Sequence, residues 1–85
     1  MSPTELRDVV GANLRRRRIE KEISQRALGD LVGLSGAQIN RIENGGSSLP
    51  VDLLAKLGEV LDEPPLYFLT ERRKPSGKEK MVSSA

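Results

Sequence analysis

The stretch SQRALGDLVGLSGAQINRIENG, from Ser24 to Gly45, decides the fold of this chain. Its apolar residues recur three or four positions apart, the spacing that places side chains on one face of a helix. Gly33 divides the stretch, because a glycine can adopt the left-handed backbone that ends a helix. Ser24 and Ser35 each stand where they can cap a helix start. The stretch therefore predicts two short helices joined by a tight turn, with Leu28, Val32, Leu34, Ile39 and Ile42 facing inward.

Gly29 lies one turn before Gly33, on the side where the two helices must approach each other. Ser24 has no Glu or Gln three residues later, so we expect no full capping box at the first helix. The pattern fits a helix-turn-helix with residues 36–43 as its second helix, while a generic helical hairpin is the alternative. Caps, glycines and apolar spacing agree, which favours the DNA-binding motif.

Several short motifs resemble the Cro and phage-repressor class (the XRE family) of helix-turn-helix regulators. The resemblance extends from about Val10 to Leu69 and is carried by Ile23-Ser24-Gln25, Gly29, Gly33-Leu34-Ser35 and Ile39-x-x-Ile42-Glu43-Asn44-Gly45. It implies an all-α, five-helix, phage-repressor-like DNA-binding domain over residues 1–70. It also implies a sequence-specific regulator, a repressor that binds a palindromic operator in double-stranded DNA as a homodimer.

The composition limits the other classes of function. Eighty-five residues make one small domain, and its core must be aliphatic because Tyr67 and Phe68 are the only aromatic residues. The chain has no cysteine and no histidine, which excludes disulfides and the usual zinc sites, so we expect no metal and no cofactor. No nucleophile–base pair is visible, which speaks against an enzyme. Without a membrane-length apolar run or a signal peptide, we expect no membrane contact and a cytoplasmic location.

The formal charge of +2 is unevenly distributed. Residues 71–85 hold five Lys or Arg and two Glu, a net of +3, which leaves −1 for residues 1–70. The basic run Arg15–Arg18 lies in the first half of the chain, whereas acidic residues gather after position 50. One basic and one acidic face suit a protein that approaches DNA in one orientation. Residues 71–85 lack any period and predict a flexible basic tail.

The first helix is expected to start with Ser2 as its cap, Pro3 in the first position and Glu5 reaching back. Its inner face carries Leu6, Val9, Val10 and Leu14. Arg17 falls on that same face and can bury its methylenes, while Arg15 and Arg16 point to solvent. In the resembled class an arginine at the position of Arg18 pairs with the glutamate that Glu43 matches, a structural ion pair.

The outer face of the helix 36–43 is expected to read bases. Relatives often carry long polar side chains at the positions of Gly36 and Ala37, and both residues are small here. Ala37 can therefore touch a thymine methyl, Arg41 suits guanine, and Asn40 or Gln38 suits adenine. A solvated helix surface is the alternative for each of them.

Phosphate contacts are expected around this helix. In relatives, the glutamine matched by Gln25 contacts a phosphate from a helix N-terminus, where exposed amides favour an anion. Ser35, at the start of the next helix, is a second candidate. After Gly45 ends that helix, we expect the amide of Gly46 and the side chain of Asn44 to meet a phosphate.

The fourth helix is expected from about Pro50 to Leu61, where Pro64-Pro65 stops it, and a short fifth helix spans residues 66–70. The apolar residues at its end are too many for one buried face, so we expect a dimer interface. Its residues are Leu61, Leu66, Tyr67, Phe68 and Leu69. A DNA-binding antitoxin or accessory factor that docks a protein partner through this face is the alternative function. The chain could also be the N-terminal piece of a larger regulator.

Overall fold

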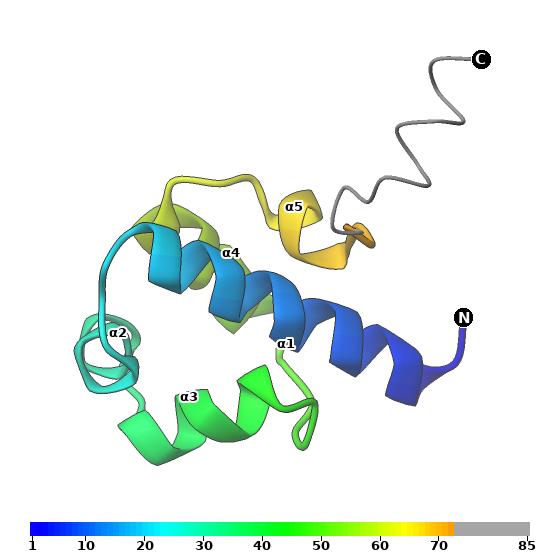
Figure 1. The fold of residues 1–85 in the computed structure, drawn as a ribbon, viewed down its shortest axis with the longest axis horizontal. Helices are drawn as coiled ribbons and strands as arrows, with labels where there is room; N and C mark the ends of the chain where they lie inside the picture. The colour runs from blue at the N-terminus through cyan, green and yellow to red at the C-terminus, as the bar shows by residue number, and fades with distance from the viewer. Residues whose placement is uncertain (73–85) are drawn as a thin grey trace, which may run out of the picture.

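The computed structural model describes residues 1–72, which form five helices and no strand. The helices are α1 Pro3–Glu20, α2 Gln25–Val32, α3 Gly36–Glu43, α4 Val51–Leu61 and α5 Pro65–Leu69. The all-α fold class is confirmed, and α3 has the expected bounds. Figure 1 shows α1 crossing the molecule, with α2 and α3 below it and α5 above it. The expected basic tail lies outside the described residues, apart from Glu71 and Arg72.

The N-termini of the first two helices are built as expected. The Ser2 hydroxyl accepts a hydrogen bond from the amide of Glu5 at 3.1 Å, and the Glu5 carboxylate accepts one from the amide of Ser2 at 2.8 Å. These bonds hold the pKa of Glu5 below its usual value of 4.5. Ser24 caps α2 by accepting from the amide of Ala27 at 3.0 Å, without a full box. Short-range side-chain signals are therefore sufficient to place both starts.

Four helices are followed, within two residues, by a residue with left-handed backbone. Gly33 (φ 80°) and Gly45 (φ 74°) follow α2 and α3, and two acidic residues, Glu22 (φ 58°) and Asp62 (φ 59°), do the same after α1 and α4. After Asp62, the amide of Glu63 donates to the carbonyl of Gly58 at 2.9 Å. This closing turn ends α4 before the chain reaches Pro64-Pro65, so the prolines expected to stop the helix begin the next element instead.

The core takes apolar side chains from all five helices. It comprises Val10, Leu14, Leu28, Val32, Ile39, Ile42, Leu54, Leu57, Leu61 and Phe68. Gly11 and Gly29 allow the helices to come this close. A Cβ added at Gly11 would lie 2.6 Å from the carbonyl oxygen of Glu43, and one at Gly29 would collide with the backbone of Leu34. The close approach expected at Gly29 is confirmed, whereas the role of Gly11 was not foreseen.

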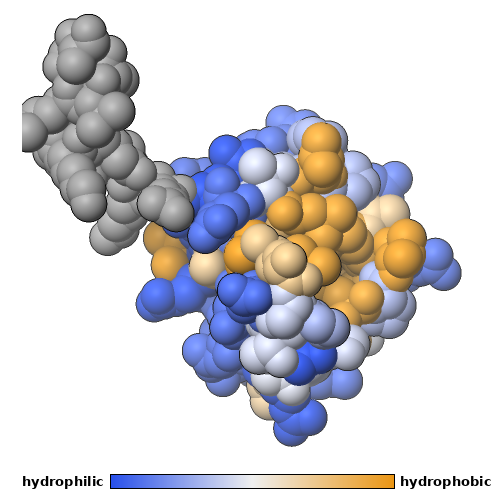
Figure 2. All heavy atoms as spheres, turned by 90° about the vertical axis from the view of Figure 1, so that its right-hand side faces the viewer, coloured by the Kyte–Doolittle hydropathy of each residue, from blue (hydrophilic) through white to orange (hydrophobic). Residues whose placement is uncertain are grey.

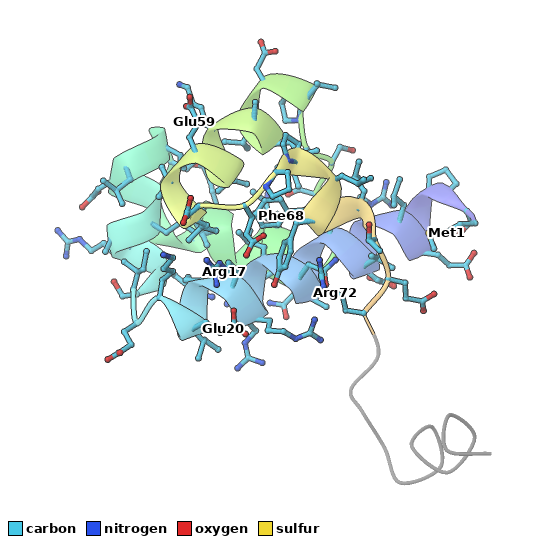
Figure 3. All side chains as sticks on the ribbon, turned by 90° about the horizontal axis from the view of Figure 1, so that it is seen from above. Met1, Arg17, Glu20, Glu59, Phe68 and Arg72 are labelled. Carbon is cyan, nitrogen blue, oxygen red and sulfur yellow. The ribbon has the colours of Figure 1, made fainter. Side chains whose placement is uncertain are left out.

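Asn13 and Glu43 are the polar residues buried within residues 1–72. Asn13, with 1% of its surface exposed, donates from Nδ2 to the carbonyls of Phe68 and Thr70, both at 2.9 Å. These bonds fasten the end of α5 to α1, and Figure 3 shows Phe68 near the centre of the molecule, where the two helices meet. Asn13 stands between Val10 and Arg17 on the inner face of α1, a polar residue in an apolar stripe.

The burial of α5 corrects the expected dimer interface. Leu61 and Phe68 have no exposed surface, because they fill the core of a single protomer, and they cannot contact a second copy. Tyr67 is half-buried, with the guanidinium of Arg72 stacked 3.8 Å from its ring centre. Leu66 and Leu69 remain exposed, at 67% and 38%. Of the five residues expected in the interface, these two leave apolar side chains exposed on α5.

Within the described residues, none of the helices combines the length and the apolar character needed to cross a bilayer. In the same part of the chain, no three side chains of His, Cys, Asp or Glu gather as ligands for a metal ion.

Candidate nucleic-acid interface

The outer face of α3 is open to solvent. Ile39 and Ile42 point into the core, which holds the helix with its opposite side outward. All four residues expected to read bases are exposed together on that side: Ala37, Gln38, Asn40 and Arg41. In Figure 1, α3 forms the lower edge of the molecule, so no other element stands between this face and a ligand below it.

A buried ion pair fixes the far end of α3. Arg18 Nε donates to Glu43 Oε2 at 2.6 Å and Arg18 Nη2 donates to Glu43 Oε1 at 3.1 Å, while Arg18 Nη1 donates to the carbonyl of Ile23 at 2.8 Å. The Glu43 side chain is only 1% exposed. The expected pairing is confirmed, and it ties α1, the α1–α2 loop and α3 into one unit.

Gln25 joins this cluster, which the sequence did not indicate. Its Nε2 donates to Glu43 Oε1 at 3.0 Å, so the start of α2 is linked to the end of α3. An amide nitrogen carries two hydrogens, and one remains for a phosphate. Gln25 therefore positions α3 and keeps one donor for an outside acceptor.

The start of α3 carries a capping box. The Ser35 hydroxyl accepts from the amide of Gln38 at 3.1 Å, and Gln38 Oε1 accepts from the amide of Ser35 at 2.8 Å. The signal was present in the sequence, because Ser35-Gly36-Ala37-Gln38 has the Ser-x-x-Gln spacing of such a box. Ser35 keeps its hydroxyl hydrogen for an external acceptor, whereas the oxygen of Gln38 is already engaged.

The turn before α3 contains Ser35 between Gly33 and Gly36, and α3 packs on α2 with a polar face exposed. This is the geometry of a groove-reading helix. The helix-turn-helix family HTH_3 matches residues 14–68 of this chain. The chain belongs to that family.

Solved structures agree with this assignment. The restriction-modification controller protein C.AhdI from Aeromonas hydrophila superposes with a TM-score of 0.74 at 26% identity, over 80% of this chain and 99% of that one. The P22 c2 repressor, solved in complex with a synthetic operator, superposes with a TM-score of 0.69 at 32% identity, over 74% of this chain and 96% of that one. One of these neighbours is named as a controller protein and the other as a repressor.

A curated relative is longer than this chain. The chain is 31% identical over 62 residues to an HTH-type transcriptional regulator of Sinorhizobium fredii whose own function is uncharacterized. The match covers 73% of this chain and 43% of the relative. The match therefore spans less than half the length of that regulator.

Two of the groups expected to contact phosphates make hydrogen bonds within the protein. The amide of Gly46 donates to the carbonyl of Arg41 at 2.9 Å, because the chain folds back over the end of α3. Asn44 Nδ2 donates to the backbone carbonyl of Asn40 at 3.0 Å and to Asn40 Oδ1 at 3.2 Å. Both expectations overlooked that the carbonyls at a helix end compete for nearby donors.

The basic run of the domain is largely neutralised by its own neighbours. Arg17 pairs with Glu20 at 3.2 Å and Glu63 at 3.3 Å, and donates from Nε to the carbonyl of Leu61 at 2.9 Å. With Arg18 held by Glu43, the run offers Arg15 and a half-buried Arg16, so it does not form the basic face expected from the sequence. Arg26 and Arg41 are exposed and take part in no ion pair among residues 1–72.

Proposed function

We propose that this protein is a transcriptional repressor that binds a palindromic operator as a dimer, with α3 in the major groove. The observation that carries the proposal is the exposed outer face of α3, with Asn40 and Arg41 at its centre. A buried bidentate ion pair holds this helix in place from behind. Such a support reduces the loss of freedom when the helix docks into a groove.

Base readout and positioning are assigned to different side chains. Arg41 is long and cationic, and its fork of donors matches the two acceptors of guanine, so it reads a base. Gln25 contacts a phosphate through its remaining amide hydrogen and supplies no base preference. The hydroxyl of Ser35 contributes a second phosphate contact at the start of α3.

An apolar face of the molecule suits a two-fold contact. A hollow of about 320 Å³ is lined by residues that include Leu6, Leu49, Val51 and Leu69. Figure 2 shows an apolar patch on the side of the molecule where α1 begins, which is the right-hand side of Figure 1. Two copies joined there would be related by a two-fold axis, as are the two halves of a palindromic operator.

Selection of bound fragments from random duplex DNA tests the function. We expect one palindromic sequence to be enriched, and binding to it to weaken steeply with salt. A chain that enriches no sequence would overturn the proposal.

The division of roles is tested on the selected operator and on random duplex at one fixed salt concentration. Arg41→Ala should cost roughly 1–3 kcal/mol on the operator and relax the preference at one base pair in each half-site. Gln25→Ala should weaken both DNAs by similar factors. Thermal melting of both variants controls for the bond between Gln25 and Glu43. If Arg41→Ala weakens both DNAs equally, Arg41 is a phosphate contact and not a base reader.

A further inference from the structure

The amide groups on the outer face of α3 are already oriented by bonds within the protein. Gln38 Oε1 lies 2.8 Å from the backbone nitrogen of Ser35, so the oxygen faces the start of the helix and Nε2 faces away from it. Asn40 Oδ1 lies 3.2 Å from Asn44 Nδ2, which turns that oxygen toward the end of the helix. Because both partners are donors, the identity of each oxygen is settled by chemistry.

The polar groups that these bonds leave directed outward are donors. No hydrogen bond among the described residues uses Gln38 Nε2, Asn40 Nδ2 or the guanidinium of Arg41. Ala37 adds a methyl group and no polar side-chain atom. A side chain that reads adenine with two bonds must offer an oxygen to N6 and a hydrogen to N7 at the same time. Each oxygen keeps one lone pair, but the bond that it already accepts directs it toward Ser35 or Asn44. Gln38 and Asn40 must therefore turn away from these partners to offer an oxygen and a hydrogen to one adenine.

We infer that α3 reads DNA as a surface of hydrogen-bond donors and so selects bases by their acceptors. Resting on the proposed function, this inference names the base edges that the recognition helix takes. Guanine presents N7 and O6 in the major groove, and thymine presents O4 beside a methyl group that suits Ala37. Cytosine presents only its N4 donor, which faces these donors unfavourably. The half-site under α3 is therefore composed of guanine and thymine on the contacted strand, and an adenine there is read through N7 alone.

Single-atom changes in the selected operator test this inference. Replacing a contacted guanine by 7-deazaguanine removes the N7 acceptor and should weaken binding by about three- to tenfold, the value of one hydrogen bond. Replacing an adenine by purine removes only the N6 amino group and should leave the affinity unchanged. The same replacements outside the half-sites control for changes in duplex stability. A loss of fivefold or more on removal of N6 would show that an amide oxygen reads adenine and would overturn the inference.

A variant of Gln38 supplies the second test. In Gln38→Glu, one carboxylate oxygen can still accept from the amide of Ser35, so the capping box is kept while the two donors are replaced by an outward acceptor. The preference at that base pair should change from an acceptor-bearing base to cytosine, whose N4 donates to a carboxylate. Melting of the variant shows that α3 is still formed. An unchanged base preference would overturn the inference, whereas a wild-type chain that selects no sequence would overturn the proposed function beneath it.

Discussion

The carboxylate of Glu43 is buried, with only 1% of the side chain exposed. Its carboxylate receives two bonds from Arg18 and one from Gln25. Removal of one partner from a buried ion pair leaves the other charge without compensation, which costs far more than the loss of an exposed charge. The arrangement of α1, α2 and α3 therefore depends on this one residue.

Glu43→Ala should lower the free energy of unfolding by about 3–5 kcal/mol. Arg15→Ala, a change at an exposed position of the same basic run, should change it by about 0.5 kcal/mol or less. Urea denaturation of both variants and the wild type measures the difference. Glu43→Gln, which keeps the oxygen but loses the charge, should fall between them. Equal midpoints for Glu43→Ala and Arg15→Ala would contradict a structural role for the pair.

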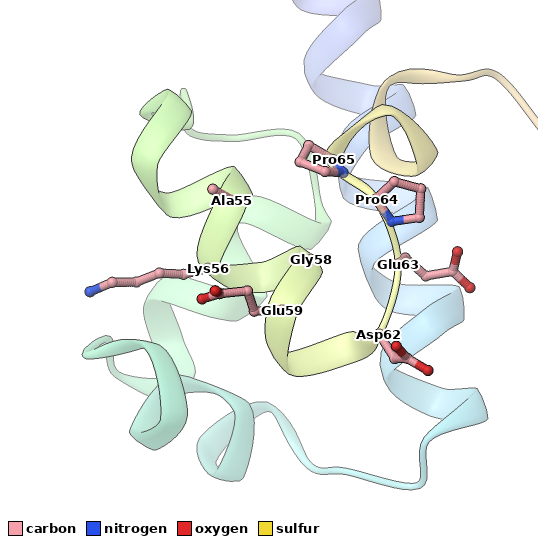
Figure 4. A pocket seen from close by; sticks show the side chains of 8 residues that line it. All are labelled: Ala55, Lys56, Gly58, Glu59, Asp62, Glu63, Pro64 and Pro65. Atoms are coloured by element: carbon pink, nitrogen blue, oxygen red, sulfur yellow. The ribbon is translucent and has the colours of Figure 1, made fainter.

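At the scale of the elements, the four helix ends differ in which residue adopts the left-handed backbone. The ends of α2 and α3 use glycine in the left-handed conformation, whereas α4 uses Asp62, which has a Cβ. Figure 4 shows the Asp62 side chain projecting outward from the turn between α4 and α5. The residue is exposed, so its side chain contributes little to hold it in this conformation.

Asp62→Gly should therefore raise the free energy of unfolding by about 0.5–1 kcal/mol, because glycine adopts this backbone without steric cost. Glu59→Gly is the matched control, since Glu59 is also exposed but lies within α4. That change should lower the stability by about 1 kcal/mol. Thermal melting compares the two. A lower melting temperature for Asp62→Gly would mean that the aspartate stabilises the turn in another way.

At the scale of the whole molecule, the apolar face is not covered by any part of residues 1–72. Val51 is 79% exposed and Leu69 is 38% exposed at the hollow beside the N-terminal part of α1. Dimeric relatives read half-sites about one helical turn, roughly 34 Å, apart. Phe68, which the sequence places in the interface, is unsuitable as a probe of it, because a polar substitution there would disrupt the core.

Val51→Lys should yield a monomer that binds the operator more weakly, because two ammonium groups would meet in the dimer contact. Ile19→Lys is the control, since Ile19 is also exposed, at 51%, but lies near the other end of α1. Sedimentation at tens of micromolar, with and without DNA, measures the state of each variant. A wild-type chain that remains monomeric under both conditions would contradict the dimer and would assign the face to a different protein partner.

The sequence determined the features that depend on neighbours along the chain. The starts of α1, α2 and α3 follow from a serine and the residues up to three positions away, and the ends of α2 and α3 follow from glycines that accept left-handed backbone. The outward position of Asn40 and Arg41 follows from helical spacing once Ile39 and Ile42 are inside. These signals also carry the family resemblance, so the fold and the location of the candidate interface could be predicted.

Only the tertiary structure decided which side chains already make hydrogen bonds within the protein before a ligand binds. Gln25 meets Glu43 across 18 positions of sequence, and Asn13 meets the carbonyl of Phe68 across 55. Phe68 is buried because α5 folds back on α1, which its own pattern of four apolar residues does not reveal. Packing brings together groups that are distant in sequence, and each hydrogen bond it satisfies removes a donor or an acceptor from the surface. The periodicity of a helix reports which residues face outward, but not which of their atoms remain free.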